Sequence, residues 1–376
     1  MTTSSPRARR ALPAALFAVS LALAAPYIAA SNAYEVTNLV SDVPGAALKT
    51  DPHLVNGWGV AFNPYNPGYV WVVANHTGVS TLYDGQGNPQ SLVVKIPAAS
   101  GNGQGSPTGI VFNGSSDFKI DVGPGAPPTP ARFIFASEDG LISAWAPGLT
   151  TAVGAATNAS AVYKGVALAG NGTRNQLYAA DFGGGKIDVY TDTFAPITVP
   201  GSFSDPHIPK GFAPFNIQNI QGNLYVAYAK LKEGSTDEQA GPGLGFVDVF
   251  DADGFLLKRL VSRGRLNAPW GLALAPAGFG RFSNRLLVGN FGDGIINAYD
   301  VFDGHLVGHL RMSNGRDVKI EGLWGIAFGN GLQNQPTDTL FFAAGPDDEN
   351  HGLYGRIDAI GSSEPGNPHD DKDDGD

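Results

Sequence analysis

The stretch Val55-Asn56-Gly57-Trp58-Gly59-Val60-Ala61-Phe62 joins an aromatic residue and a glycine to alternating small and large apolar residues. Residues 268–274 and 322–328 are near copies, and looser copies begin at Pro107, Tyr163 and Pro214. One residue marks the same position in each copy: Gly59, Gly109, Gly165, Asn216, Gly271 and Gly325. The markers are 50, 56, 51, 55 and 54 residues apart. A period near 50 residues with strand-like content predicts a β-propeller.

Within each repeat, short apolar runs are separated by Gly, Asn and Pro, which is typical of strands joined by hairpins. In the first repeat we expect strands at residues 59–62, 69–74, 79–83 and 91–96. The last repeat lacks a fourth strand, whereas residues 34–40 form a strand-like run with no partner in the first repeat. We therefore predict an all-β, six-bladed β-propeller of four-stranded antiparallel blades over residues 34–360. The N-terminal strand would join the last blade and so remove an exposed sheet edge.

The composition excludes several classes of function. The chain has 376 residues, 43% of them hydrophobic, which is enough for a sizeable core. It has no cysteine, so neither disulfides nor thiol chemistry are available. Its formal net charge of -10 argues against nucleic-acid binding, which needs clustered Lys and Arg. We expect a monomer whose partner is a small molecule, a glycan or a protein.

Both ends of the chain differ from the repeats. Residues 1–33 carry Arg7, Arg9 and Arg10, then an apolar run, then small residues, as an export signal does. Arg9-Arg10 raises the alternative of a twin-arginine route. We expect cleavage after Ala33 and a protein that is periplasmic or extracellular and not embedded in a membrane. Residues 361–376 predict a disordered acidic tail, with weak cation binding as an alternative role.

One face of the predicted propeller gathers the polar residues. In a four-stranded blade, the turn between the second and third strands lies on the same face as the link into the next inner strand. Binding residues often lie on such loops. The insertion at residues 231–244 also falls there and could act as a lid. The ligand-face candidates are Asp51, Asn56, His76, Glu138, Asp139, Asp205, Lys230 and His351.

An Asp-Pro-His motif occurs twice on this face, at residues 51–53 and 205–207. Because these copies precede the first and fourth repeats, we expect them on opposite sides of the central channel. His53 and His207 are then candidate catalytic bases, or ligands of a transition metal together with the aspartates. The alternative is that Asp-Pro begins a turn in each link and that the motif has no chemical role.

The residue that ends the second strand is short and polar in several repeats. Asn75, Asp181 and Asn290 occupy this position, and Glu321 lies near it in the last repeat. Their oxygens could ring the channel mouth and bind a hard cation, so calcium is the expected metal, with a transition metal as the alternative. The same residues could instead satisfy backbone groups of their own turns.

The segments at residues 55–59, 106–109, 267–271 and 321–325 resemble those of an exported bacterial family of conserved hypothetical proteins, found partly in genomes with PEP-CTERM sorting systems. The resemblance covers most of residues 34–360 and implies a six-bladed propeller, with no established activity. This chain has no Pro-Glu-Pro, apolar segment and basic run at its C-terminus, so surface anchoring is not expected.

More distantly, the inner strands look like NHL repeats and the gluconolactonase-like hydrolases. That likeness implies calcium at the channel mouth and hydrolysis of lactones or phosphotriesters. The sequence thus favours an exported propeller that binds a ligand or partner through its polar face. The alternative is a calcium-dependent hydrolase in which Asn75, Asp181, Asn290 and Glu321 hold the metal.

Overall fold

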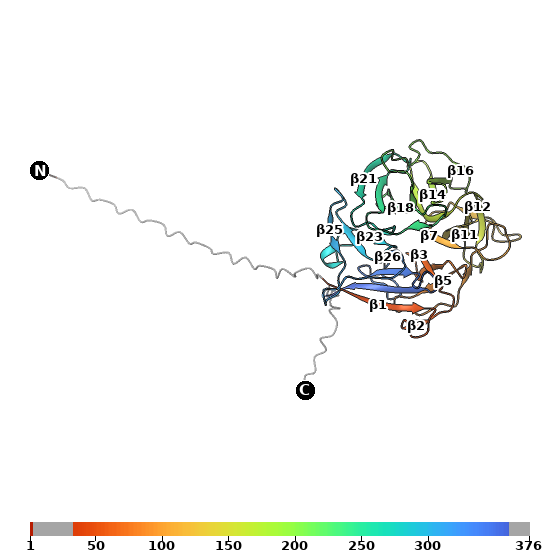
Figure 1. Ribbon diagram of the computed structural model, residues 1–376, viewed down its shortest axis with the longest axis horizontal. Coiled ribbons are helices and arrows are strands. Elements are labelled where there is room, and N and C mark those ends of the chain that lie inside the picture. The colour runs from red at the N-terminus through yellow and green to blue at the C-terminus, as the bar shows by residue number, and fades with distance from the viewer. Residues whose placement is uncertain (3–32, 361–376) are drawn as a thin grey trace, which may run out of the picture.

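The computed structural model describes residues 1–2 and 33–360. In this part of the chain, six β-sheets stand around a common axis like the blades of a propeller (Figure 1). The predicted export signal and acidic tail lie outside the described residues, apart from the extreme N-terminus and Ala33. The described part contains no helix long and apolar enough to cross a bilayer. The six-bladed, all-β prediction is confirmed.

The blades follow one another along the chain, each with its first strand innermost. Blade 1 contains β3 (Gly57–Phe62), β4 (Val70–Ala74), β5 (Val79–Tyr83) and β6 (Val94–Lys95). Blade 2 contains β7 (Pro107–Phe112), β10 (Phe133–Ser137), β11 (Leu141–Trp145) and β12 (Val153–Thr157). Blade 3 contains β13 (Tyr163–Gly170), β14 (Asn175–Asp181), β15 (Lys186–Thr191) and β16 (Pro196–Ile197).

Blade 4 contains β17 (Phe212–Ile220), β18 (Asn223–Leu231), β20 (Gly245–Phe250) and β21 (Leu256–Ser262), with the short β19 (Glu238–Gln239) paired to β18. Blade 5 contains β22 (Pro269–Leu274), β23 (Leu286–Asn290), β24 (Ile296–Tyr299) and β25 (Leu306–His309). Blade 6 contains β26 (Leu323–Phe328), β27 (Leu340–Ala344) and β28 (Leu353–Ala359). A two-stranded ribbon of β8 (Lys119–Ile120) and β9 (Thr129–Pro130) and a 3-10 turn at Gly280–Phe282 complete the described elements.

The ring closes through the N-terminal strand, as predicted. Strand β1 (Tyr34–Ser41) pairs antiparallel with β28, from Tyr34 opposite Ala359 to Ser41 opposite Leu353. The short β2 (Lys49–Thr50) adds a parallel strand outside β1. Tyr34 is 1% exposed, and its hydroxyl donates to the carbonyl of Phe279 in blade 5 at 3.1 Å. The first residues of the propeller therefore fasten blade 6 to the neighbouring blade.

The repeated glycines meet at the axis. A Cβ on Gly59 would lie 2.7 Å from the carbonyl oxygen of Thr108, and one on Gly271 would lie 2.8 Å from that of Trp324. Blade 4 has Asn216 at this position, and its amide nitrogen instead donates to the carbonyl of Trp270 at 2.8 Å. The marker position thus needs either no side chain or one that bonds to the next blade. Only an axial cavity of about 20 Å³ remains there.

Candidate functional site

The two sets of loops that the sequence analysis placed on one face lie together in the structure. In every blade, a backbone N–H that follows or ends the second strand donates to a carbonyl in the link before the inner strand. Examples are Asn75 to Asn56 at 2.9 Å and Phe291 to Ala268 at 3.0 Å. These bonds hold the two sets of loops together around one end of the axis, which we call the axial mouth.

Three tryptophans close the channel at the axial mouth. Trp58 and Trp324 stack with ring centroids 3.5 Å apart, and Trp270 meets both rings edge-on at about 6 Å. Phe291 stacks on Trp324 at 4.0 Å. All three indoles are at most 5% exposed. The recurring Trp-Gly residues are therefore blade-packing residues, as their repeated position indicates.

A buried lysine, Lys164, lies beside these tryptophans. The Lys164 side chain is 4% exposed, and its Nζ lies 2.5 Å from Glu138 Oε1 and 5.0 Å from the centre of the Trp58 ring. The residue before each marker is Trp58, Thr108, Lys164, Phe215, Trp270 or Trp324. Lys164 is thus the one charged residue in this ring of six. A lysine at this position of the repeat is the sequence signal from which the residue could have been found, but Lys164 was not among the predicted site residues.

Three carboxyl groups act on the charge of the Lys164 ammonium. Burial alone would lower the pKa of Lys164, but the carboxylates of Glu138, Glu238 and Glu349 outweigh burial and raise it. Burial raises the pKa of Glu238 to about 7 and also raises that of Glu349, although Lys164 opposes both shifts. Glu238 belongs to the 231–244 insertion, and Ala240 of the same insertion lines a pocket together with Phe291 and Glu349. The site holds more carboxyl groups than the single lysine can neutralise.

Two asparagines extend the cluster. Asn75 Nδ2 donates to Glu138 Oε2 at 3.0 Å, and Asn56 Nδ2 donates to Glu349 Oε1 at 3.3 Å. Asn56 is 1% exposed, yet its Oδ1 accepts no hydrogen bond from the described residues. Among the sequence candidates, the structure thus brings Asn56, Asn75 and Glu138 together. His76 follows Asn75 and lies near enough to Glu349 to lower its pKa.

The other metal candidates accept hydrogen bonds from the backbone of their own or neighbouring loops. Asp181 Oδ1 accepts from the backbone N–H groups of Val162 and Gly184 at 3.0 and 2.8 Å. Asn290 Oδ1 accepts from the Asn267 N–H at 3.1 Å. Glu321 Oε1 accepts from the Asp347 N–H at 3.2 Å. These contacts fit the structural interpretation of the position, in which short polar residues satisfy turn backbone.

The two Asp-Pro-His motifs are held by separate blades. Asp51 accepts from the Tyr83 hydroxyl and contacts His53 Nδ1, both at 2.9 Å. Asp205 is bound by Arg259 of β21, with the Arg259 Nε at 2.8 Å. In both motifs the backbone N–H of the histidine donates to the aspartate side chain, as in an Asx turn. The side chain of His53 is half exposed, and residue His207 is exposed.

The remaining ligand-face candidates also have local partners. Asp139 Oδ2 accepts from the Ala99 N–H at 2.6 Å. Lys230 Nζ donates to the Lys210 carbonyl at 3.3 Å and lies over the Phe212 ring. His351 Nδ1 lies 2.9 Å from Asp42 Oδ2, and this carboxylate raises the histidine pKa.

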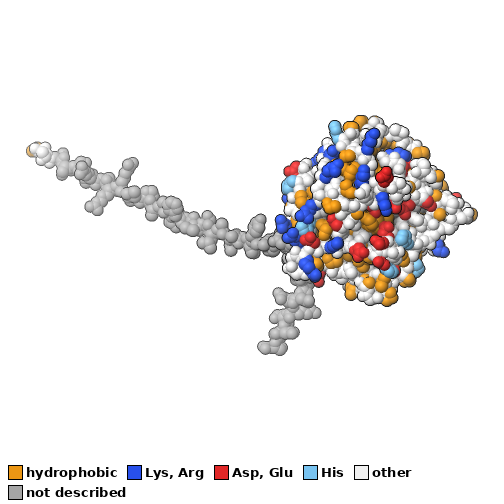
Figure 2. Space-filling model, viewed as in Figure 1, with side chains coloured by type: hydrophobic (Ala, Val, Ile, Leu, Met, Phe, Trp, Pro, Cys, Tyr) orange, Lys and Arg blue, Asp and Glu red, His pale blue; other side chains and the backbone are white. Residues whose placement is uncertain are grey.

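Charge is unevenly spread over the surface. Figure 2 shows Asp and Glu side chains around the middle of the visible face, with Lys and Arg mainly over the part where β21 and β25 lie.

Within the described residues, one group of three ligand-type side chains has its atoms within 4.8 Å of one another: Asp300, Asp303 and His305. This group lies in the turn between β24 and β25 and contains none of the predicted metal ligands.

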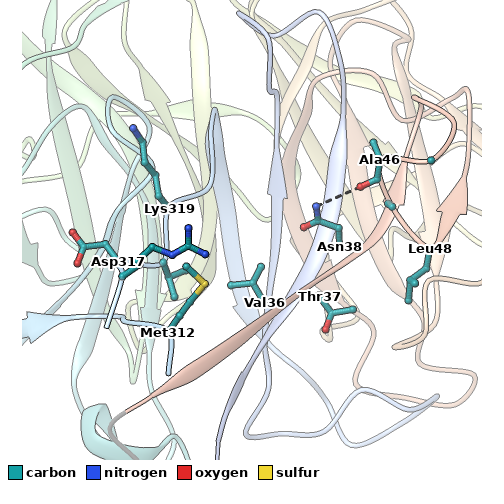
Figure 3. A pocket seen from close by; sticks show the side chains of 12 residues that line it. Val36, Thr37, Asn38, Ala46, Leu48, Met312, Asp317 and Lys319 are labelled. Atoms are coloured by element: carbon teal, nitrogen blue, oxygen red, sulfur yellow. Dashed lines mark hydrogen bonds between the residues drawn. The ribbon is translucent and has the colours of Figure 1, made fainter. Parts of the chain in front are cut away.

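A wide groove lies away from the axis. It encloses about 800 Å³ between β1 with its following loop and the segment 312–319 (Figure 3). Val36 of β1 and Met312 both line it, and Asn38 Nδ2 donates to the Ala46 carbonyl at 3.4 Å. Asp317 and Lys319 bring opposite charges to the same wall. This groove gathers no buried charge of the kind found at the axial mouth.

Comparison with known proteins gives relatives but no activity. No family model matches the chain. Uncharacterized protein R648 of Acanthamoeba polyphaga mimivirus is 34% identical over 340 residues, covering 87% of this chain and 81% of that protein. Uncharacterized protein L690 of the same virus is also 34% identical over 340 residues, covering 86% and 85%. The chain belongs to the same family as these two proteins.

Among solved structures, the fold is similar to selenomethionine-substituted virginiamycin B lyase from Staphylococcus aureus. The TM-score is 0.51 with 11% sequence identity, and the match covers 87% of this chain and 99% of the lyase chain. At this identity the likeness shows the propeller fold alone.

Proposed function

We propose that the protein binds a small-molecule ligand at the axial mouth. The observation that carries this proposal is the burial of Lys164 among Glu138, Glu238 and Glu349 on an aromatic floor. Burying unbalanced charge costs stability, and apolar residues close the axis in most other blades. Polar groups collected at such a cost are typical of binding and catalytic sites.

The test is a ligand screen by thermal melting of the purified protein, with amines, carboxylates, sugars and neutral aromatics as separate classes. We expect at least one class to raise the melting temperature of the wild type and to lose most of that effect in Lys164→Met. Lys49→Met, at an exposed position in β2, is the matched control and should respond like the wild type. If no class shifts the wild type, or if Lys164→Met responds unchanged, the proposal is wrong.

We propose in addition that the protein is exported. The support is the basic and apolar pattern of residues 1–33, together with the resemblance to an exported bacterial family. Cleavage after Ala33 would leave β1 intact, because β1 begins at Tyr34. Expression of the full chain in a bacterium, followed by N-terminal sequencing of the periplasmic fraction, should give Tyr34 as the first residue. An uncleaved chain in the cytoplasm would contradict export.

Calcium-dependent hydrolysis remains the alternative activity. Of its predicted ligands, Asn75 lies at the Lys164 cluster and Glu321 lines a neighbouring pocket. Elemental analysis of protein purified without added metal, followed by melting with and without a chelator, tests this alternative. Bound calcium and a chelator-induced loss of stability would support it, whereas copper, zinc or iron would point to a transition-metal site. A metal-free protein with an unchanged melting temperature would remove it.

A further inference from the structure

A pocket of about 420 Å³ opens at the axial mouth between blades 5 and 6. Its walls come from the turn after β23, from the link before β26, and from the turn after β27. Ala240, in the 231–244 insertion, closes it on the blade 4 side. Glu349 lines this pocket and its charge also raises the pKa of Lys164, so the pocket and the site proposed above share this residue.

The charges that line the pocket are mostly negative. Asp293, Glu321, Asp348 and Glu349 supply four carboxyl groups against the single ammonium of Lys319. Besides Glu349, which accepts from Asn56 Nδ2, two of these carboxylates are held by hydrogen bonds. Asp293 accepts hydrogen bonds from Asn290 Nδ2 and the Ile295 N–H, both at 3.1 Å, and Glu321 accepts from the Asp347 N–H. Such a lining attracts cations and repels anions.

The pocket also has an aromatic wall. Phe291 lines it and stacks on Trp324, with ring centroids 4.0 Å apart. The face of an aromatic ring attracts an ammonium or guanidinium group, most strongly where water is excluded. Lys164 shows the same arrangement within this protein, since its ammonium lies 5.0 Å from the Trp58 ring centre and is paired with a carboxylate.

A second, independent observation is the unused acceptor of Asn56. Its Oδ1 is buried and receives no hydrogen bond from the described residues. The atom lies 2.2 Å from the position that a Cβ on Gly345 would take, and Gly345 lines the pocket. This buried acceptor therefore lies beside the Gly345 backbone of the pocket wall, in the space that a side chain at Gly345 would need. A buried acceptor without a donor costs stability, so a donor on a ligand would be favoured there.

The spacing of the carboxylates favours an organic cation over a metal ion. No three carboxylates of this pocket have ligand atoms within 4.8 Å of one another, since the one such group in the described residues lies elsewhere. Calcium needs six to eight oxygen ligands at about 2.3–2.6 Å. A flat or elongated cation with several N–H donors can instead reach carboxylates that lie further apart.

We propose that this pocket binds the ammonium or guanidinium group of a small organic ligand, with Glu349 and Glu321 as counter-charges and Phe291 as the ring over which the cation lies. This inference rests on the proposed function and names the ligand class for that site. The ligand's N–H groups would also supply the donor that Asn56 Oδ1 lacks.

Binding of such a cation should release protons. Burial raises the pKa of Glu349 and brings that of Glu238 to about 7, so both take up protons more readily than exposed glutamates. The charged groups that face them are Lys164, Glu138, His76 and Asp237, with Lys319 on the pocket wall. A cation beside ionised carboxylates is stabilised and one beside protonated carboxyls is not, so affinity should rise with pH as these carboxyls ionise.

The experiment is calorimetric titration of the whole protein at about pH 8 with three phenyl compounds that differ in charge: 2-phenylethylamine, 2-phenylethanol and phenylacetate. Agmatine serves as a guanidinium probe, and calcium chloride alone as a metal probe. We expect the two cations to bind, and phenylethanol and phenylacetate to bind at least about tenfold more weakly. We also expect the titration with calcium alone to give no measurable heat of binding.

Three variants complete the test. Glu349→Gln should weaken amine binding about tenfold or more and flatten its pH dependence. Glu321→Gln, at a more exposed position, provides the same test if Glu349→Gln fails to fold. Glu35→Gln, on the exposed side of β1, is the matched control and should bind like the wild type.

Several results would overturn the inference. Binding of only anionic or neutral compounds would leave the ligand site standing but refute the cation, as would equal amine binding by wild type and Glu349→Gln. Calcium binding without amine binding would replace the organic cation with a metal ion. If no compound of any class binds here or shifts the melting temperature in the broader screen, both the inference and the proposed function fail.

Discussion

Gly325 lies so close to Trp58 that a Cβ built on the glycine would stand 2.4 Å from the Trp58 carbonyl oxygen. The backbone nitrogen of Val60 would be 3.1 Å away, so the backbone of β3 must move to admit a methyl group. We predict that Gly325→Ala lowers the free energy of unfolding by about 1–3 kcal/mol, the usual cost of overpacking. Urea-induced unfolding, followed by tryptophan fluorescence, measures the change.

Gly154 provides the matched control for this prediction. It also lies in a β-strand, in the outer strand β12, but a Cβ there would meet only the end of the Leu141 side chain at 3.5 Å. Gly154→Ala should therefore change the free energy of unfolding by less than about 0.5 kcal/mol. Equal effects of the two substitutions would show that crowding at the axis does not explain the repeated glycine.

The pair of Lys164 and Glu138 should be strongly coupled. Lys164→Met leaves Glu138 beside Glu238 and Glu349 without their shared cation, so we predict a loss of about 2–4 kcal/mol. Removing both charges, in Lys164→Met with Glu138→Gln, should cost less than the sum of the two single substitutions. A double-mutant cycle of unfolding free energies gives the coupling energy. Strictly additive losses would mean that the two groups do not interact, contrary to their 2.5 Å separation.

Asp248 should make stability depend on pH. Its side chain is fully buried, and burial, followed by the charge of neighbouring Asp205, raises its pKa from 3.8 to about 8. The folded protein then holds a proton that the unfolded chain releases above about pH 4, so stability falls as pH rises from about 4 to about 8. Each pH unit in this window costs up to about 1.4 kcal/mol. Asp248→Asn, which never ionises, should remove this dependence and be more stable than the wild type at about pH 8.

Between about pH 7 and 8, the effect of Asp248 on stability can be separated from that of Glu238. Glu238 also has a raised pKa, but its pKa is about 7. Most of the stability that its ionisation removes is therefore already lost at about pH 7. Glu238→Gln should therefore keep the slope between these two pH values, and Asp248→Asn should lose it. Unfolding free energies of the three proteins at matched ionic strength decide the point. A slope that survives in Asp248→Asn would assign it to another group.

The architecture could be predicted from sequence because each blade repeats one local pattern. The Trp-Gly step at Trp58, Trp270 and Trp324 marks the inner strands, and the unpaired run at residues 34–40 indicates how the ring closes. These features depend on strand period and turn residues, which are local in the chain.

The site could not be predicted in the same way. Glu138 and Lys164 are 26 residues apart, and Glu349 lies more than 180 residues beyond Lys164, so only the closed ring brings them together. Sequence also gives no distance between loops on one face. Polar residues at equivalent places, such as Asn75 and Asp181, therefore looked alike, although Asn75 contacts Glu138 and Asp181 accepts from the Gly184 N–H of its own turn.

Closure by β1 should be essential to the propeller. Val40 in β1 is fully buried and lies opposite Tyr354 of β28. It packs in a cluster with Val72 of blade 1 and with Leu54 of the link that precedes blade 1. We predict that Val40→Asp lowers the free energy of unfolding by more than about 3 kcal/mol, because it buries a carboxylate without a partner. The exposed edge of β28 in the loosened protein should also promote association through strand pairing.

Thermal melting and size-exclusion chromatography measure these two effects. Glu35→Ala, at an exposed position of the same strand, is the control and should melt near the wild type and remain the same size. A chain that begins at residue 34 should match the full-length protein, because β1 is retained, whereas one that begins at residue 42 should aggregate or fail to fold. The chain that begins at residue 42 could instead melt and elute like the one that begins at residue 34. In that case β1 would be an accessory strand. The propeller would then be stable with only three strands in blade 6.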